Sequence, residues 1–310
     1  MTKSSSLQTN YRFTGHGTFP CRYTWLPKAV RHLSDETLFQ NEDEAMVSLG
    51  VGKNMVRAIR FWADVIGVSA DGGNGRSTVS PFGLQLLGEK SGFDPYLEDL
   101  KTLWLIHWKM STSSEPLFGW EYLLNSWHRS DFTRSEVVEF FADEANRLGK
   151  KLSRVTLDDH FTTFLHTYVP TRSQKGEVLE DNLDCPLIEL DFLIKVGERA
   201  VAESNYRESI YSFRNEEKPE ISGELFAYCL NDFWTKHRSN ESTLTFRDIC
   251  VGRSSPGVVL KLPEQAIRAR LETLEKDSHG SFSFEESAAL QQVTRRKETS
   301  AAKLLARIYQ

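Results

Sequence analysis

The sequence predicts a mainly α-helical protein with small β-hairpins, in which an N-terminal winged helix-turn-helix is followed by further helical, winged-helix-like subdomains. Three observations predict this class. Apolar residues recur at helical spacing, glycine-containing turns and polar runs separate these stretches, and short segments rich in Ile, Val, Tyr and Phe are typical of strands. With 310 residues, of which 39% are hydrophobic, the chain has enough apolar material for two or three small domains.

Polar stretches that contain serine or proline divide the chain. The polar start is expected to be disordered, and the Ser-rich run 111–116 and the dipeptide Lys218-Pro219 mark further boundaries. The expected parts are a disordered tail over 1–10, a winged helix-turn-helix domain over 11–115, a second helical, winged-helix-like domain over 116–218, and a C-terminal helical domain over 219–310.

The strongest local pattern begins at Glu42. A short helix precedes the tight turn Gly50-Val51-Gly52, and a second helix is expected over 53–66. This second helix has an apolar side made of Met55, Val56, Ile59, Trp62 and Ile66, and a basic side made of Lys53, Arg57 and Arg60. Residues 67–80 then read as two short strands around an Asn-Gly loop, which predicts a β-hairpin with Arg76 near its tip.

The order of helix, turn, basic helix and hairpin fits the binding of duplex DNA. A helix enters the major groove, where arginine bonds O6 and N7 of guanine together. The candidate DNA contacts here are Lys53, Arg57 and Arg60 on the helix, Asn54 at its start, and Arg76 against the adjacent backbone or minor groove. Two alternatives stay open: the basic residues only solvate a surface helix, or the winged helix binds another protein.

A weaker helix-turn-helix pattern follows in the second domain. One helix over 136–148 ends before Gly149, another covers 153–168, and strand-like segments lie between 187 and 213. The second of these helices carries acidic residues as well as Arg154, so the pattern leaves DNA contact there open. Three capping-box matches, which begin at Thr133, Thr245 and Ser283, mark expected helix starts.

Three carboxylates precede an apolar helix that is expected over 100–108. Asp94, Glu98 and Asp99 are the candidate ligands of Mg²⁺ or Mn²⁺, and they are also candidate catalytic residues together with His107. A divalent metal and a histidine are groups that activate water for phosphodiester cleavage. The alternative is structural, with acidic residues favoured by the helix dipole and a core histidine bonded to a carbonyl.

A second histidine lies among aromatic residues and glycines near the start of the first domain. His16 and Arg22, beside Tyr23 and Trp25, are candidates for contact with DNA phosphate or with a partner. They fit a packed polar cluster equally well.

Charge and cysteine content bound the class of protein. Lysine and arginine number 38 and aspartate and glutamate 43, for a net charge of −5, which excludes a polybasic coat protein but leaves room for a basic face. The four cysteines show no CxxC spacing, and the polar start lacks the apolar stretch of a signal peptide. No apolar window is long enough to cross a bilayer. We therefore expect a cytoplasmic protein with no membrane contact.

Several blocks of sequence resemble a bacterial family long labelled only as of unknown function, which includes the SspB-like proteins of DNA phosphorothioation. The blocks are Gly15-His-Gly-Thr-Phe-Pro-Cys-Arg-Tyr-Thr-Trp-Leu26, Leu49-Gly-Val-Gly-Lys-Asn-Met-Val-Arg-Ala-Ile-Arg-Phe-Trp62, Phe93-Asp-Pro-Tyr-Leu-Glu-Asp99, Thr102-Leu-Trp-Leu-Ile-His-Trp108, Asp181-Asn-Leu-Asp-Cys-Pro-Leu187 and Ser254-Ser-Pro-Gly-Val-Val-Leu-Lys-Leu262. They span nearly the whole chain beyond its polar tail.

The resemblance implies a role in a bacterial system that replaces a non-bridging phosphate oxygen of DNA by sulfur and defends against phage. It implies double-stranded DNA as a partner, with a cysteine desulfurase, an ATP pyrophosphatase and an ATPase as further subunits, and it implies DNA nicking as the activity. It identifies no catalytic residue. The alternatives are a non-catalytic DNA-binding scaffold of the same system and a winged-helix transcription regulator. A reader of paired half-sites favours a homodimer.

Overall fold

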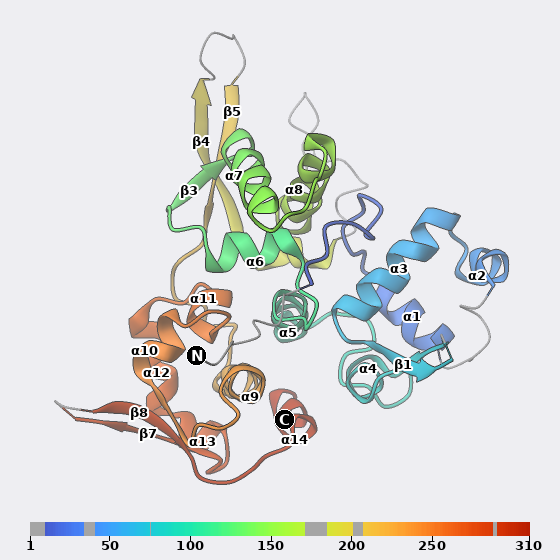
Figure 1. The fold of residues 1–310 in the computed structure, drawn as a ribbon. Helices are drawn as coiled ribbons and strands as arrows, with labels where there is room; N and C mark the ends of the chain where they lie inside the picture. Colours follow the sequence, from blue (N-terminus) through green and yellow to red (C-terminus); the bar gives the residue numbers. More distant parts are fainter. Residues whose placement is uncertain (1–9, 34–40, 75, 171–184, 201–206, 288–289) are drawn as a thin grey trace, which may run out of the picture.

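The computed structural model describes residues 10–33, 41–74, 76–170, 185–200, 207–287 and 290–310. Most elements are helices, and each sheet is small and antiparallel, so the predicted mainly α class is confirmed. Helix α5 (Leu100–Ser111) lies near the centre of Figure 1, between the N-terminal helices, the group around β4 and β5, and the C-terminal group. The predicted tail over 1–10 lies almost wholly outside the described residues.

The N-terminal group contains the predicted helix-turn-helix and hairpin. Its elements are α1 (Trp25–Leu33), α2 (Glu42–Leu49), α3 (Lys53–Val65), β1 (Ser69–Gly73), β2 (Arg76–Val79) and α4 (Pro81–Leu87). Helix α2 is capped at its C-terminus by Gly50, whose φ of 65° suits glycine, and the Val51 N–H donates to the Met46 carbonyl at 3.2 Å. Strands β1 and β2 pair from Ser69 opposite Val79 to Gly73 opposite Arg76.

The middle group combines helices with a three-stranded sheet. Its elements are α6 (Phe118–Asn125), β3 (Asp131–Thr133), α7 (Arg134–Arg147), α8 (Arg154–Tyr168), the 3₁₀ helix η3 (Pro186–Leu190), β4 (Leu193–Ala200) and β5 (Arg207–Phe213). The strand order is β3-β5-β4. The strand-like segments expected between 187 and 213 are confirmed, whereas β3 was not predicted.

The C-terminal group, which is expected from the sequence to be a helical domain, is mostly helical and also contains a three-stranded sheet. Its elements are α9 (Gly223–His237), β6 (Thr243–Thr245), α10 (Phe246–Val251), α11 (Pro256–Val259), α12 (Glu264–Glu272), α13 (Leu274–Asp277), β7 (Phe282–Glu286), β8 (Gln291–Arg295) and α14 (Ala301–Ile308). Ser283 lies in β7 rather than at a helix start. Buried Phe282 and Val293 hold this hairpin on the core.

The middle and C-terminal groups repeat one arrangement. In each, a helix is followed by a three-residue strand, a capping box, further helices and a hairpin whose second strand pairs with the short strand. Thr133 with Glu136 and Thr245 with Asp248 form the two boxes, which begin at the last residues of β3 and β6. Two of the three predicted capping boxes are therefore confirmed, and they occupy equivalent places.

The core is continuous and rich in tryptophan. Most side chains of helix α5 are buried, and Trp104 and Trp108 on it are fully buried. The C-terminal residues return to its start: Tyr309 stacks on Phe93 with ring centroids 4.9 Å apart, and Lys101 Nζ donates to the Ile308 carbonyl at 2.9 Å. Within the described ranges, no helix is long and apolar enough to span a membrane.

Candidate nucleic-acid interface

Helix α3 presents its predicted basic side outward. Val56, Ile59 and Trp62 on its apolar side are fully buried, because α1 and α2 pack against it. On the other side Lys53, Asn54 and Arg57 are exposed, and Arg60 is half-buried. The lists of the apolar and basic residues therefore hold as predicted, with the helix ending at Val65 and not Ile66.

An acidic residue of α2 neutralises part of this side. Glu42 accepts from Nε of Arg57 at 2.8 Å and lies 2.9 Å from Nζ of Lys53. The hydrogen bond from Arg57, and then that from Lys53, lower the pKa of Glu42 to about 2. Glu42 makes both ion pairs but lies 11 and 15 residues before its partners, and because this is not a helical spacing, no local pattern predicts the contact.

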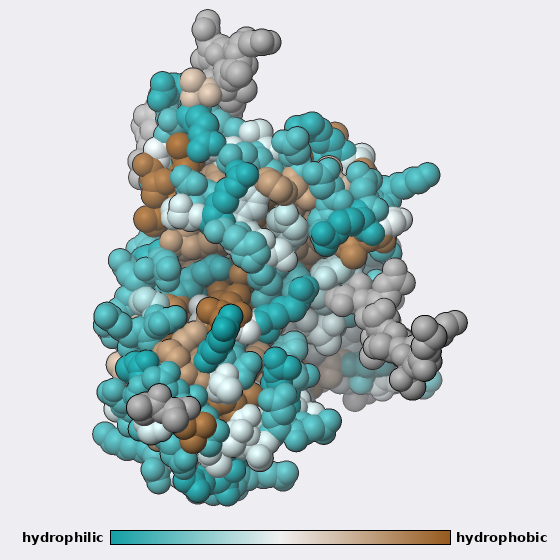
Figure 2. Space-filling model, turned by 60° about the vertical axis from the view of Figure 1, so that its left-hand side comes forward, coloured by the Kyte–Doolittle hydropathy of each residue, from teal (hydrophilic) through white to brown (hydrophobic). Residues whose placement is uncertain are grey.

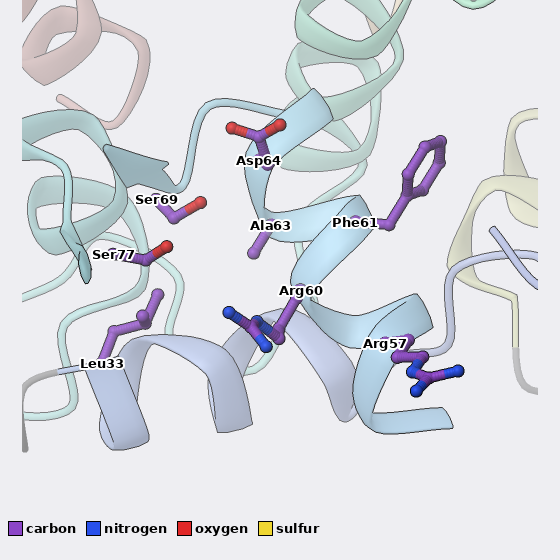
Figure 3. A pocket seen from close by; sticks show the side chains of 8 residues that line it. All are labelled: Leu33, Arg57, Arg60, Phe61, Ala63, Asp64, Ser69 and Ser77. Atoms are coloured by element: carbon purple, nitrogen blue, oxygen red, sulfur yellow. The ribbon is translucent and has the colours of Figure 1, made fainter. Parts of the chain in front are cut away.

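A pocket of about 360 Å³ lies beside the basic side, between α3, the β1–β2 hairpin and the end of α1. Figure 3 shows Arg60 projecting toward Leu33 and Ser77, whereas Arg57 points to the other side of the helix. The hydroxyl-bearing residues Ser69 and Ser77 line the hairpin wall. Guanidinium and hydroxyl groups, both hydrogen-bond donors, therefore line the pocket together with the carboxylate of Asp64.

The other two predicted basic contacts differ in position. Arg76 is exposed at the start of β2, opposite Gly73, as expected for a residue near the tip of the hairpin. Arg22 is half-buried, and its guanidinium lies 5.6 Å from the ring centroid of Trp25. This packing on the indole agrees with the packed cluster that the sequence offered as the alternative for Arg22.

His16 belongs to a buried polar cluster, and the structure does not support its predicted contact with DNA. Its side chain is buried at 3% exposure, and Nε2 lies 3.1 Å from Nδ1 of His160 on α8. The Gly119 N–H donates to Nε2 of His160 at 2.8 Å, which leaves the proton of neutral His160 on Nδ1. Burial lowers the pKa of His16 to about 4 and that of His160 to about 3.

Two of the three carboxylates before α5 accept hydrogen bonds from backbone N–H groups. Both oxygens of Asp94 accept N–H groups, from Glu98 at 2.9 Å and from Asp99 at 3.0 Å. Asp99 caps α5 by accepting the Lys101 N–H at 2.8 Å, while Glu98 is exposed. Across the described chain, no three His, Cys, Asp or Glu side chains converge as metal ligands. These three residues do not fit a metal ion as they are arranged, because two of the carboxylates cap the backbone.

His107 is fully buried, so the predicted catalytic role gains no support. Its Nδ1 lies 2.8 Å from the Tyr168 hydroxyl and its Nε2 lies 2.9 Å from the Val259 carbonyl. The carbonyl can only accept, so Nε2 carries the proton and Nδ1 accepts from Tyr168. Burial lowers the pKa of His107 to about 4. His107 therefore links α5 to α8 and α11 by hydrogen bonds, which is the structural role that the sequence offered as the alternative.

Residues 13–309 match the model of a family described as a protein of unknown function, DUF4007. The chain belongs to the DUF4007 family. Two solved structures share this fold at 27% sequence identity. An SspB crystal structure has a TM-score of 0.81, with 98% of this chain and 90% of that chain covered. A magnesium ion-bound SspB structure has a TM-score of 0.80, with 95% and 87% covered. Among curated proteins, none matches this DUF4007 member.

Proposed function

We propose that this DUF4007 protein is a DNA-binding component of a bacterial DNA phosphorothioation system that defends against phage. The observation that carries the proposal is the outward basic side of α3 beside the β1–β2 hairpin. Lys53, Asn54 and Arg57 are exposed there, and the adjoining pocket supplies Arg60 and two serines. Likeness to SspB structures over nearly the whole chain supports the assignment to this system.

Charge distribution supports selective rather than general binding. The net charge of −5 repels a polyanion at long range, so affinity depends on the local basic side. Glu42 already pairs with Lys53 and Arg57, and such exposed ion pairs are worth only about 0–1 kcal/mol. A phosphate or a guanine edge can therefore replace Glu42 at little cost. Figure 2 shows the side of the molecule that lies to the left in Figure 1, where hydrophilic side chains predominate and apolar residues gather in separate patches.

The same proposal includes the partners that the family resemblance implies. These are a cysteine desulfurase, an ATP pyrophosphatase and an ATPase, acting with this protein on DNA in the cytoplasm. Its negative net charge is compatible with docking to basic surfaces on them. A homodimer is the expectation if the recognised site is a paired half-site.

Duplex binding by an Arg57→Ala, Arg60→Ala variant tests the proposal. Each base-contacting arginine is expected to be worth about 1–3 kcal/mol, so each loss weakens binding about 5- to 150-fold. Fluorescence anisotropy measures the affinity, both for a duplex library of random sequence and for the duplexes that the wild type selects from it. The control is an Arg247→Ala, Lys303→Ala variant, which removes the same charge from exposed positions in the C-terminal group. Equal affinity of the two variants would move DNA contact away from α3.

Strand nicking is a second candidate, favoured by the magnesium ion bound in one similar SspB structure. The carboxylates of Asp94 and Asp99 bind backbone N–H groups, so they do not fit a metal ion in their present arrangement. The test incubates purified protein with supercoiled plasmid and Mg²⁺ or Mn²⁺ and looks for open circles. Duplex binding without open circles would favour the non-catalytic scaffold.

A further inference from the structure

The turn between α7 and α8 carries a cluster of exposed cations. Lys150, Lys151 and Arg154 lie within five residues and are exposed, and the Arg147 side chain just before them is 79% exposed. Arg147 pairs with Glu144 at 2.8 Å. The other three form no ion pair with any residue in the described part of the chain. They are therefore available to an external anion.

The backbone fixes this turn at both ends. Gly149 has a φ of 70°, and the Lys150 N–H donates back to the Ala145 carbonyl at 2.8 Å, which closes α7. Ser153 then opens α8 by accepting the Thr156 N–H at 3.1 Å. Because these hydrogen bonds hold the backbone of the turn, its cations are attached to a fixed backbone. Binding of an anion therefore does not carry the entropic cost of ordering that backbone.

The same construction closes α2 and opens α3. There, Gly50 takes the left-handed conformation, and the Val51 N–H returns to the Met46 carbonyl. In both places a helix, a left-handed glycine and a second helix are followed by an antiparallel hairpin, β1–β2 in one case and β4–β5 in the other. The α7–α8 turn thus occupies the place in the middle group that the α2–α3 turn occupies in the first.

The two turns differ in how their charges are balanced. Glu42 pairs with two of the cations on α3. On α8, by contrast, the Asp158 carboxylate pairs with Arg134, with Nη1 and Oδ1 2.8 Å apart. It therefore does not neutralise the cations of the turn. The cations of the second turn therefore attract an anion without first displacing a carboxylate.

We propose that Lys150, Lys151 and Arg154 form a second contact with the phosphate backbone of the duplex bound by α3. Charge complementarity selects this occupant, since clustered unpaired cations bind phosphates by releasing counterions. The contact is independent of sequence, so it contributes affinity and orientation and not base readout. The inference rests on the proposed DNA-binding function and extends it from one unit of the chain to two.

The salt dependence of duplex affinity tests this surface. The variant Lys150→Gln, Lys151→Gln, Arg154→Gln is compared with wild type in 50–200 mM NaCl. Losing three phosphate contacts lowers the slope of log K against log [salt] by about 2 to 3 in magnitude. The matched control is Arg247→Gln, Lys276→Gln, Lys303→Gln, which removes three exposed cations from the C-terminal group. Thermal unfolding midpoints establish that both variants fold.

Each outcome separates the inference from the function on which it rests. A lower slope and weaker binding in the α7–α8 variant alone support the second contact. A slope equal to that of wild type, while Arg57→Ala, Arg60→Ala loses affinity, overturns the second contact and leaves DNA binding through α3. Equal losses in the variant and the matched control also overturn it, because net charge alone then explains the effect. Failure of the wild type to bind duplex DNA refutes both.

Discussion

Acidification from pH 7 to pH 5 is expected to destabilise this protein strongly, because three histidines are buried in the neutral form. Burial lowers the pKa of His16 to about 4, of His107 to about 4 and of His160 to about 3. The unfolded chain binds these protons near pH 6.5, so it holds more protons than the folded protein between the two values. Stability is therefore full above pH 6.5 and falls as the pH drops toward 4.

The size of the effect follows from the difference in pKa. One pH unit between folded and unfolded values corresponds to about 1.4 kcal/mol, so each histidine costs about 2 kcal/mol on going from pH 7 to pH 5. The three together cost about 4 to 6 kcal/mol, the lower figure allowing for the contact between His16 and His160. A domain stable by 5–15 kcal/mol loses a large share of that margin.

Urea unfolding followed by tryptophan fluorescence at pH 7 and pH 5 provides the measurement, since the chain has seven tryptophans. His107→Gln retains a donor and an acceptor for Val259 and Tyr168 but does not titrate. It should reduce the pH-dependent loss by about 2 kcal/mol. His128→Gln, at an exposed position, is the control and should leave the loss unchanged. A free energy of unfolding that is equal at the two pH values would refute the reasoning, as would an unaltered loss in His107→Gln.

Two further predictions concern the two capping boxes and the basic side of α3. Thr133→Ala and Thr245→Ala should each lower the free energy of unfolding by about 1 kcal/mol in urea titrations. The two losses should add, because the boxes cap different helices. No loss in either variant would contradict the capping role. Glu42→Gln should tighten duplex binding several-fold at low salt by leaving Lys53 and Arg57 without their carboxylate, less so at high salt. Glu44→Gln, exposed on the same turn of α2, is the anisotropy control, and equal affinities would show that Glu42 does not restrain the basic side.

Elements with strong local signals were predictable from the sequence. Helix α3 was placed within one residue because its apolar side repeats at helical spacing and Gly50 ends the helix before it. Strands β3 and β6 were missed, since three residues are too few to show alternation. Ser283 misled because a four-residue capping pattern occurs by chance, and only the tertiary pairing of β7 with β8 decides its conformation.

The residues of the candidate site also differ in how far the sequence could predict their roles. The basic side of α3 follows from helical periodicity and was found, whereas the roles of the histidines depend on distant partners. His16 meets His160 across 144 residues, and His107 meets Val259 across 152. No local pattern carries such information, so a packed histidine and a catalytic one look alike in sequence. Asp94 was the exception, since its bonds to Glu98 and Asp99 are local.

The central position of α5 also bears on the order in which the chain can fold during synthesis. His107 needs the carbonyl of Val259, which is translated 152 residues later. At about 5–20 residues per second, ribosomes take roughly 8 to 30 seconds to reach it. During that interval the C-terminal residues that pack on α5 are absent. The tryptophans of α5 are then exposed to chaperones and to association with other chains. The N-terminal helices can form first, but the native core closes only when the last third of the chain has emerged.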